Sequence, residues 1–419
     1  MTTHHTAALP PETEVLIVGA GPTGLALAIS LQQAGISHLI VDKLSHGLNT
    51  SRAAVIHAHT LDVLDSLGVA TQLAAAGLRL TDFRIRNRDR TLLAVGFRNL
   101  PSPHPYLLML PQEQTERILN ERLAALGGGV QRGVTVTSVQ QHATGATVTL
   151  QSSLGETAVK ARFVVGGDGM QSTVRTAMGT DFEGGAYEDS FILADVSMDW
   201  PLAALEVSLF FSPAGLAVVA PLPDNRFRVV ASVDHAPEHP TLEHIQALLD
   251  ARGPRKSKTV VRELFWSSRF RIHHRLARSY RSGRLFLMGD AAHVHSPAGG
   301  QGMNTGLVDA VVLGQLLARA IRTGDHSVLD QYQSMRRPAA QKVLGMVGWL
   351  TRIATLRGSL RLAVRDAALS VMNMLPPVRK KLMMNLSGLS RKALAQLPEK
   401  DRDGTPYDLR LQTVKGDRI

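Results

Sequence analysis

The chain has 419 residues, a mean hydropathy near zero (+0.01) and 19% charged residues, so it is neither disordered nor fibrous, and its length suggests two or three domains. It contains no cysteine, which excludes disulfide scaffolds, zinc–cysteine sites, iron–sulfur clusters and thiol nucleophiles. The net charge of +11 resides in residues 336–419, which hold 17 Lys and Arg against 6 Asp and Glu, so we expect no general nucleic-acid-binding surface.

Residues 1–14 lack the basic-then-apolar order of a secretory signal, and a cytoplasmic location is therefore expected. Residues 15–37 are uncharged over a membrane-length window, but their glycines, Pro22 and paired glutamines indicate a strand, a turn and a helix. We expect no transmembrane segment.

The first half of the chain alternates between strands and helices. A buried strand at 15–18, a helix at 25–34 closed by Gly35, and a strand at 38–41 form one β-α-β unit of a parallel sheet. Further helices are expected at 53–67 and 114–126, and further strands at 134–139, 146–151 and 162–165.

From residue 181 the pattern changes to antiparallel strands, expected at 191–199, 205–211, 215–221 and 226–233. Residues 181–270 contain 10 of the 19 aromatic residues. Aromatic residues favour sheets, and they also line pockets for flat apolar ligands, so both interpretations stay open. Parallel-sheet character returns at 285–288, followed by a helix at 302–321 and a largely helical segment at 339–398.

The first motif, Gly19-Ala20-Gly21-Pro22-Thr23-Gly24, lies directly between a strand and a helix. Its glycines permit a tight turn and the close approach of a pyrophosphate to the helix N-terminus. Asp42 ends the next strand, where a carboxylate accepts the hydroxyls of an adenine ribose. This combination indicates a dinucleotide but does not separate NAD from FAD.

Two further motifs separate them. Gly166-Gly167-Asp168-Gly169 precedes a helix for which Ser172 is the expected N-cap. Gly289-Asp290 ends a strand, and residues 299–304 (Gly-Gly-Gln-Gly-Met-Asn) open a helix. Asp290 can accept a ribityl hydroxyl, and the positive helix end stabilises negative charge on a reduced flavin ring.

With the three motifs in this order, residues 14–340 resemble the FAD-dependent monooxygenases of the para-hydroxybenzoate hydroxylase type. The resemblance implies an α/β fold: a Rossmann-like FAD-binding domain (glutathione-reductase-like), an inserted, mostly antiparallel β-sheet substrate domain and a C-terminal helical segment. The expected domains are residues 12–180 with 271–338 (FAD), 181–270 with about 78–108 (substrate), 339–398 (helical) and 399–419 (tail). Many relatives carry Asn and Trp-Lys where Val312, Gln315 and Leu316 follow Asp309 here, a departure that concerns the subgroup.

The resemblance also implies the chemistry. FAD, reduced by NADPH or NADH that docks transiently, would capture O2 as a C4a-hydroperoxide and pass one oxygen to an aromatic or polycyclic substrate. The residues expected to bind the cofactor are Gly19, Gly21, Pro22, Thr23, Gly24, Asp42, Lys43, Arg52, Gln112, Asp168, Gly289, Asp290, Pro297, Gly299, Gly300, Gly302, Met303 and Asn304. Phe210, Pro221 and Trp266 are expected near the substrate. His57, His293 and His295 are candidate proton relays, although packed bystanders are the commoner case, and no metal site is expected.

Other functions stay open. The same fold serves an epoxidase, or a flavin oxidase or reductase that inserts no oxygen. A flavin-containing binding or membrane-surface protein is a second class, because Arg352, Arg357, Arg361 and Arg365 recur at near-helical spacing. The apolar residues beside them, Leu356, Leu360, Val364, Val371 and Met374, are expected to pack onto the protein, with contact to an anionic membrane as the alternative.

Overall fold

The computed structural model of the protein describes residues 9–47, 53–234, 236–296, 299–354, 356 and 358–397. Its first sheet has a parallel centre in which β1 (Glu12–Val18) lies between β2 (His38–Asp42) and β11 (Gly155–Gly166). The strand order is β17-β18-β11-β1-β2-β8, and an antiparallel pair joins it through β11. The remaining strands are β8 (Val130–Arg132), β9 (Thr135–Gln141), β10 (Ala146–Ser152), β17 (Arg281–Ser282) and β18 (Leu285–Leu287).

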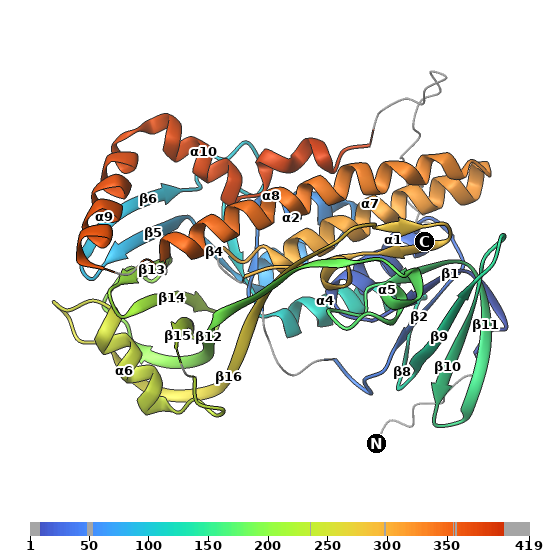
Figure 1. Ribbon diagram of the computed structural model, residues 1–419, viewed down its shortest axis with the longest axis horizontal. Coiled ribbons are helices and arrows are strands. Elements are labelled where there is room, and N and C mark those ends of the chain that lie inside the picture. Colours follow the sequence, from blue (N-terminus) through green and yellow to red (C-terminus); the bar gives the residue numbers. More distant parts are fainter. Residues whose placement is uncertain are drawn as a thin grey trace, which may run out of the picture.

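Helices bury this sheet. α1 (Pro22–Gln33) packs against α4 (Gln112–Ala125) and α7 (Gly302–Thr323), and α8 (Asp330–Ala354) contacts α7 (Figure 1). A Cβ on Gly314 would lie 2.3 Å from Oγ of Ser30, so only glycine permits this approach of α7 to α1. Gly35 ends α1 with a φ of 68°, as the sequence predicted.

The second sheet is mostly antiparallel, with the order β19-β16-β12-β15-β14-β13-β5-β6. Its strands are β5 (Asp82–Asn87), β6 (Arg90–Gly96), β12 (Phe182–Asp199), β13 (Glu206–Ser212), β14 (Gly215–Leu222), β15 (Arg226–Val233), β16 (Val260–Ala277) and β19 (His293–Val294). One face packs on α6 (Leu242–Arg252), and Figure 1 shows the long strands β12 and β16 running from this sheet toward the first. The predicted fold class is confirmed.

One predicted helix is interrupted. Within 53–67 the structure has β3 (Val55–Ile56), then α2 (Ala58–Leu64) and a short 3-10 helix, Asp65–Leu67. Val55 and Ile56 pair with β7 (Leu107–Met109), which also pairs with β4 (Leu78–Leu80). Strand pairing with a distant segment therefore overrides the helical pattern, and β-branched side chains favour this outcome. α3 (Ala70–Ala76) follows.

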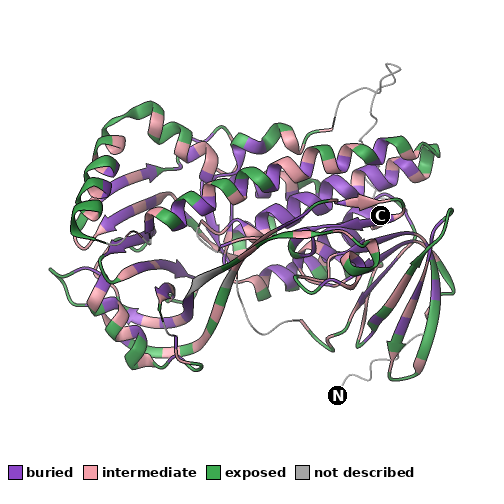
Figure 2. Ribbon diagram, in the orientation of Figure 1, coloured by how far each residue is buried: buried purple, intermediate pink, exposed green. Residues whose placement is uncertain are grey.

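The C-terminal region is helical, as predicted, but its apolar stripe is not where we expected it. α9 (Ser359–Met374) contacts β6 and buries Arg365 and Leu369. Figure 2 shows that much of α9 is exposed. Its exposed residues include apolar ones: Leu360, Val364, Val371 and Met374 are 76%, 61%, 56% and 77% exposed. The expectation that these four pack onto the protein is wrong. α10 (Pro376–Leu386) and a 3-10 helix, Leu389–Leu394, complete the region; Arg357 and the tail 399–419 lie outside the described residues.

Among the described residues, no helix combines the length and the apolar character that crossing a membrane requires.

Candidate active site

The loop between β1 and α1 requires glycine at two positions. Gly19 has a φ of 98°, and a Cβ on it would lie 2.5 Å from the carbonyl oxygen of Gly167. A Cβ on Gly24 would lie 1.9 Å from the carbonyl oxygen of Gly19. At Gly21 a Cβ would meet no atom within 4 Å, and no side chain caps the helix there, which Pro22 begins. The N-terminus of α1 is thus open to a phosphate.

Asp42 lies against this loop at the carboxyl end of β2. Its Oδ2 accepts a hydrogen bond from the backbone N–H of Ala20 at 2.7 Å, and its Oδ1 accepts one from Leu44 at 2.8 Å. Lys43, next to it, is exposed. The carboxylate therefore stands beside the phosphate-binding turn, where the acid of a dinucleotide site is needed.

The second motif, residues 166–169, follows β11 at the carboxyl edge of the sheet, where β1 and β2 also end. Oδ2 of Asp168 accepts a hydrogen bond from the backbone N–H of Thr173 at 2.7 Å. Ser172 caps α5 (Thr173–Met178) by accepting from Arg175 at 3.0 Å, which confirms the predicted cap. Burial raises the pKa of Asp168, and its Oδ1 has no hydrogen-bond partner among the described residues. Asp168 therefore fixes the start of α5 beside the turn that follows β11.

Thr23 joins the first motif to the third. A Cβ on Gly289 would lie 3.0 Å from Oγ1 of Thr23, and a Cβ on Gly306 would lie 2.5 Å from the same atom. The turn after β18 and the second turn of α7 therefore both approach the first turn of α1. Asp290, in the 3-10 turn after Gly289, is exposed beside them.

Asn304 holds the loop that leads into α7. Its Nδ2 donates to the carbonyl oxygens of Val55 at 2.8 Å and Gly300 at 2.7 Å, and its Oδ1 accepts from the backbone N–H of His57 at 2.8 Å. Gly299 and Gly300 have φ values of 86° and 61°, and a Cβ on Gly300 would lie 2.0 Å from Cγ1 of Val55. Strand β3, which the sequence did not predict, is therefore the support of this loop.

Among the described residues, no side chain caps the N-terminus of α7. The helix begins at Gly302, no side chain caps it at Gln301, and its first turn contains no acidic residue. Gly302 and Met303 are partly exposed. This end carries the partial positive charge that stabilises an anionic ring.

Of three further residues predicted to bind the cofactor, the structure describes only one. Gln112, at the start of α4, accepts from the backbone N–H of Ala53 at 3.3 Å and donates to Glu116 at 2.8 Å, and burial raises the pKa of Glu116. Arg52 and Pro297 lie outside the described residues.

The candidate histidines bind neighbouring backbone. His57 is 3% exposed and donates from Nε2 to the carbonyl oxygen of Gly299 at 2.9 Å. Nδ1 of His295 lies 3.0 Å from the carbonyl oxygen of Ser296. Burial lowers the pKa of each ring to about 4, so both are neutral at pH 7. These contacts favour the bystander interpretation of both.

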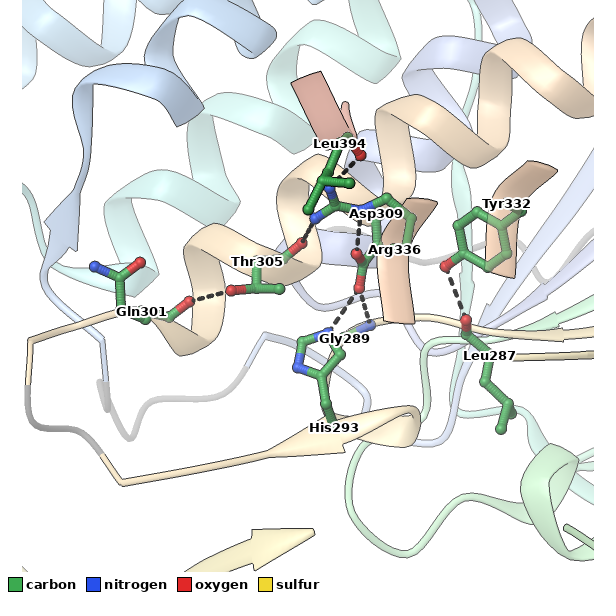
Figure 3. Close-up of polar contacts among 9 residues, drawn as sticks. All are labelled: Leu287, Gly289, His293, Gln301, Thr305, Asp309, Tyr332, Arg336 and Leu394. Carbon is green, nitrogen blue, oxygen red and sulfur yellow. Dashed lines mark hydrogen bonds and ion pairs between the residues drawn. The ribbon is translucent and has the colours of Figure 1, made fainter. Parts of the chain in front are cut away.

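His293 belongs to a buried charge network that the sequence did not predict (Figure 3). Nε2 of His293 lies 2.7 Å from Oδ2 of Asp309, and Nε of Arg336 lies 2.7 Å from Oδ1 of Asp309. Burial alone would raise the pKa of Asp309, but Arg336 and His293 outweigh it and lower that pKa. Arg336 also donates to the carbonyl oxygen of Leu394 at 2.9 Å, so the network ties α7 and α8 to the C-terminal segment. Asp309 and Arg336 lie 27 residues apart, and no local pattern marks them as partners.

An apolar cavity of about 10 Å³ lies between the second sheet and the C-terminal helices. Its lining residues are Phe83, Ile85, Leu93, Phe211, Trp349, Leu350, Ile353, Leu369, Leu382 and Leu386. A Cβ on Gly299 would lie 3.9 Å from a methyl group of Leu350 and of Leu386, so the cavity adjoins the loop before α7. This volume holds at most one water molecule, and an aromatic ring requires the helices to separate from the sheet.

The three residues predicted to contact substrate do not line this cavity. Phe210 packs edge-on against Trp200 on the α6 side of the sheet, with ring centroids 6.0 Å apart. Pro221 pairs with Phe227, and Trp266 pairs with β12. The neighbour of Phe210, Phe211, lines the cavity instead. Adjacent residues of a strand face opposite sides, but the sequence does not say which side holds the cavity.

Comparison with known proteins identifies the family. A family profile described as the FAD binding domain matches residues 12–346. The chain is similar to the 6-methylpretetramide 4-monooxygenase of Streptomyces rimosus, with 34% identity over 91% of this chain and 71% of that one. The chain belongs to the FAD-dependent aromatic monooxygenases.

Solved structures agree with this FAD-dependent monooxygenase fold. The p-nitrophenol 4-monooxygenase PnpA of Pseudomonas putida DLL-E4 superimposes with a TM-score of 0.82, covering 91% of this chain and 99% of that one at 24% identity. The Diels-Alderase PyrE3, from the biosynthetic pathway of pyrroindomycins, superimposes with a TM-score of 0.76, covering 90% and 80% at 28% identity.

The polar groups of this monooxygenase fit FAD. The uncapped N-termini of α1 and α7 and the glycine positions that exclude a Cβ lie on elements that meet at Thr23 or at the same sheet edge.

Proposed function

We propose that the protein uses NAD(P)H, O2 and FAD to hydroxylate an aromatic or polycyclic substrate in the apolar cavity. The observation that carries the proposal is the position of Leu350 and Leu386, which line the cavity. Each has a methyl group 3.9 Å from where a Cβ on Gly299 would lie, and Gly299 belongs to the loop that fits the flavin. The named activity of the Streptomyces rimosus relative, a 6-methylpretetramide monooxygenase, supports a polycyclic substrate.

Each part of the site has a separate task. When bound, FAD would accept reducing equivalents from NAD(P)H and would then activate O2. The open end of α1 would bind the pyrophosphate, and Asp42 the adenine ribose. The N-terminus of α7 would stabilise negative charge on the reduced ring. The apolar walls would orient the substrate and exclude water, which protects a reactive oxygen donor from wasteful breakdown.

The nicotinamide cofactor would dock transiently. The sequence contains one strand-linked Gly-x-Gly-x-x-Gly motif, at Gly19–Gly24, and the α1 end that it forms fits FAD. We therefore propose that the nicotinamide cofactor has no separate domain of its own. We also propose that bound substrate accelerates the reduction of the flavin.

The test is a library of aromatic and polycyclic compounds screened for stimulated NAD(P)H oxidation under ¹⁸O2. A product that gains one ¹⁸O atom supports hydroxylation or epoxidation, and its NMR spectrum separates the two. Stimulated NAD(P)H consumption without oxygen in any product would refute oxygen insertion.

A cavity variant locates the substrate. Leu382→Trp narrows the cavity and should raise KM at least several-fold, while FAD binding stays unchanged. Leu154→Trp is the matched control, because Leu154 is 74% exposed between β10 and β11. Equal KM values in the two variants would place the substrate elsewhere.

An intramolecular cycloaddition, which inserts no oxygen, is the second candidate, favoured by the similarity to the Diels-Alderase PyrE3. It predicts a product of unchanged mass that forms without NAD(P)H. The same library, incubated anaerobically with holoenzyme alone, tests it.

Contact with an anionic membrane is a third proposal, and it rests on α9. Leu360, Val364, Val371 and Met374 are exposed on α9, which also carries exposed Arg361. α10, which contacts α9, carries exposed Arg379, Lys380 and Lys381. Docking of a second copy of this chain on α9 would bring positive charges of the two copies together, whereas anionic lipid would neutralise them.

Sedimentation with vesicles tests this contact. We expect salt-sensitive binding to vesicles containing phosphatidylserine and none to phosphatidylcholine alone. Val364→Gln with Met374→Gln should weaken it, whereas Leu154→Gln removes an equally exposed leucine far from α9 and should not. Equal sedimentation of the variants would exclude α9 as the contact.

A further inference from the structure

A second cavity, of about 20 Å³, lies where α2, α7, α8 and the 3-10 helix Leu389–Leu394 meet. Its walls are polar, unlike those of the first cavity. The side chains that line it include His59, Gln301, Arg336 and Arg391. A cavity of this volume holds one water molecule or one ion of similar size.

Positive charge in these walls is not balanced. Arg336 pairs with Asp309, the carboxylate that His293 also contacts. Arg391 is 8% exposed, and among the described residues it donates only to neutral oxygens, namely Oε1 of Gln301 at 2.8 Å and a backbone carbonyl at 3.1 Å. Among the described residues, therefore, two buried guanidinium groups share one carboxylate here. A buried charge is stable only when an opposite charge lies near it.

His59 adds an unsatisfied hydrogen-bond donor. The residue is 6% exposed, and neither ring nitrogen has a partner among the described residues. Either neutral tautomer carries one N–H, so one donor is left buried and unpaired. Burial first, and then Arg336 and Arg391, lower the pKa of His59 to about 3, so the ring itself adds no positive charge at pH 7.

We propose that this pocket binds a monovalent inorganic anion of the halide class, which accepts a hydrogen bond from His59 and balances the charge of Arg391. The volume excludes a phosphate, and the excess positive charge favours an anion over water. Because Arg391 contacts Gln301, the anion would stabilise the docking of the C-terminal segment beside the loop that precedes α7.

The test uses the FAD-loaded protein at constant pH and ionic strength. We expect a higher melting temperature in sodium chloride or bromide than in sodium gluconate, with an effect that saturates as the halide concentration rises. Crystals grown in sodium bromide should show an anomalous peak between His59 and Arg391. A water molecule at that position with no anomalous signal, or a halide effect confined to the apoprotein, would overturn the assignment.

Variants distinguish halide binding at this site from a general effect of salt on the melting temperature. His59→Leu removes the donor and should abolish the halide dependence of the melting temperature. Arg379→Met, which removes an exposed arginine of α10, is the control and should keep it. Equal halide responses in His59→Leu and the wild type would contradict the proposal, and the bromide measurement decides the question should that variant fail to fold.

Discussion

Oδ1 of Asp309 accepts a hydrogen bond from Nε of Arg336 at 2.7 Å inside the contact between α7 and α8, and both side chains are almost fully buried. The other carboxylate oxygen accepts from the backbone N–H of Gly289 at 3.2 Å. One carboxylate therefore connects the third FAD motif, the helix that follows it and the C-terminal region.

Asp309→Asn should destabilise the fold by about 3–5 kcal/mol, because it leaves the buried guanidinium of Arg336 without a counter-charge. Urea unfolding at pH 7 measures the loss. Asp330→Asn is the control: Asp330 pairs with Arg281 at a 79% exposed position, where such a pair contributes about 0–1 kcal/mol. Equal losses in the two variants would show that burial of the network does not matter.

Acid should destabilise the protein as the pH falls from about 6.5 to about 4. The folded-state pKa values of His57 and His295 are lowered to about 4, whereas an unfolded histidine has a pKa near 6.5. Over that range the unfolded chain binds protons that the folded chain does not. The contribution of these two histidines to the free energy of unfolding is therefore fully present above about pH 6.5 and is lost progressively as the pH falls toward about 4.

Urea midpoints at pH 7, 6 and 5 test this dependence. The loss should be shallower in His57→Gln than in the wild type. His142→Gln, at an exposed position after β9, is the matched control. An unchanged slope in His57→Gln would mean that this ring does not titrate below its usual range.

Asn304→Ala should weaken FAD binding about tenfold or more. It removes the two bonds that hold Val55 and Gly300 and the one accepted from His57, and each buried hydrogen bond contributes about 1 kcal/mol. Titration of the apoprotein with FAD, followed by flavin fluorescence, gives the change in Kd. Asn373→Ala removes one bond to Ala94 on β6 and should leave that Kd unchanged.

Gly300→Ala should also impair flavin binding, because its Cβ would overlap Cγ1 of Val55 and its φ of 61° disfavours alanine. Adding Val55→Ala removes the overlap and should restore part of the affinity, but not the part due to φ. Gly345→Ala, inside α8 where a Cβ meets open space, should be neutral or stabilise by up to about 1 kcal/mol. No rescue by Val55→Ala would show that the overlap is not the cause.

The sequence alone determined the elements that we propose bind the cofactor. The glycine turn before α1, the acid at Asp42, the cap at Ser172 and the order of the three motifs are local patterns, because a tight turn, a helix N-terminus and a strand end each require particular residues at adjacent positions.

Only the tertiary structure decided which side chains those elements meet. Val55 supports the loop at Gly300 from 245 positions away, and Phe211 rather than Phe210 faces the apolar cavity. The same holds for the exposed apolar face of α9 and for the pairing of Asp309 with Arg336. These contacts join segments distant in sequence, and no local propensity encodes which face of a strand or helix the rest of the fold will cover.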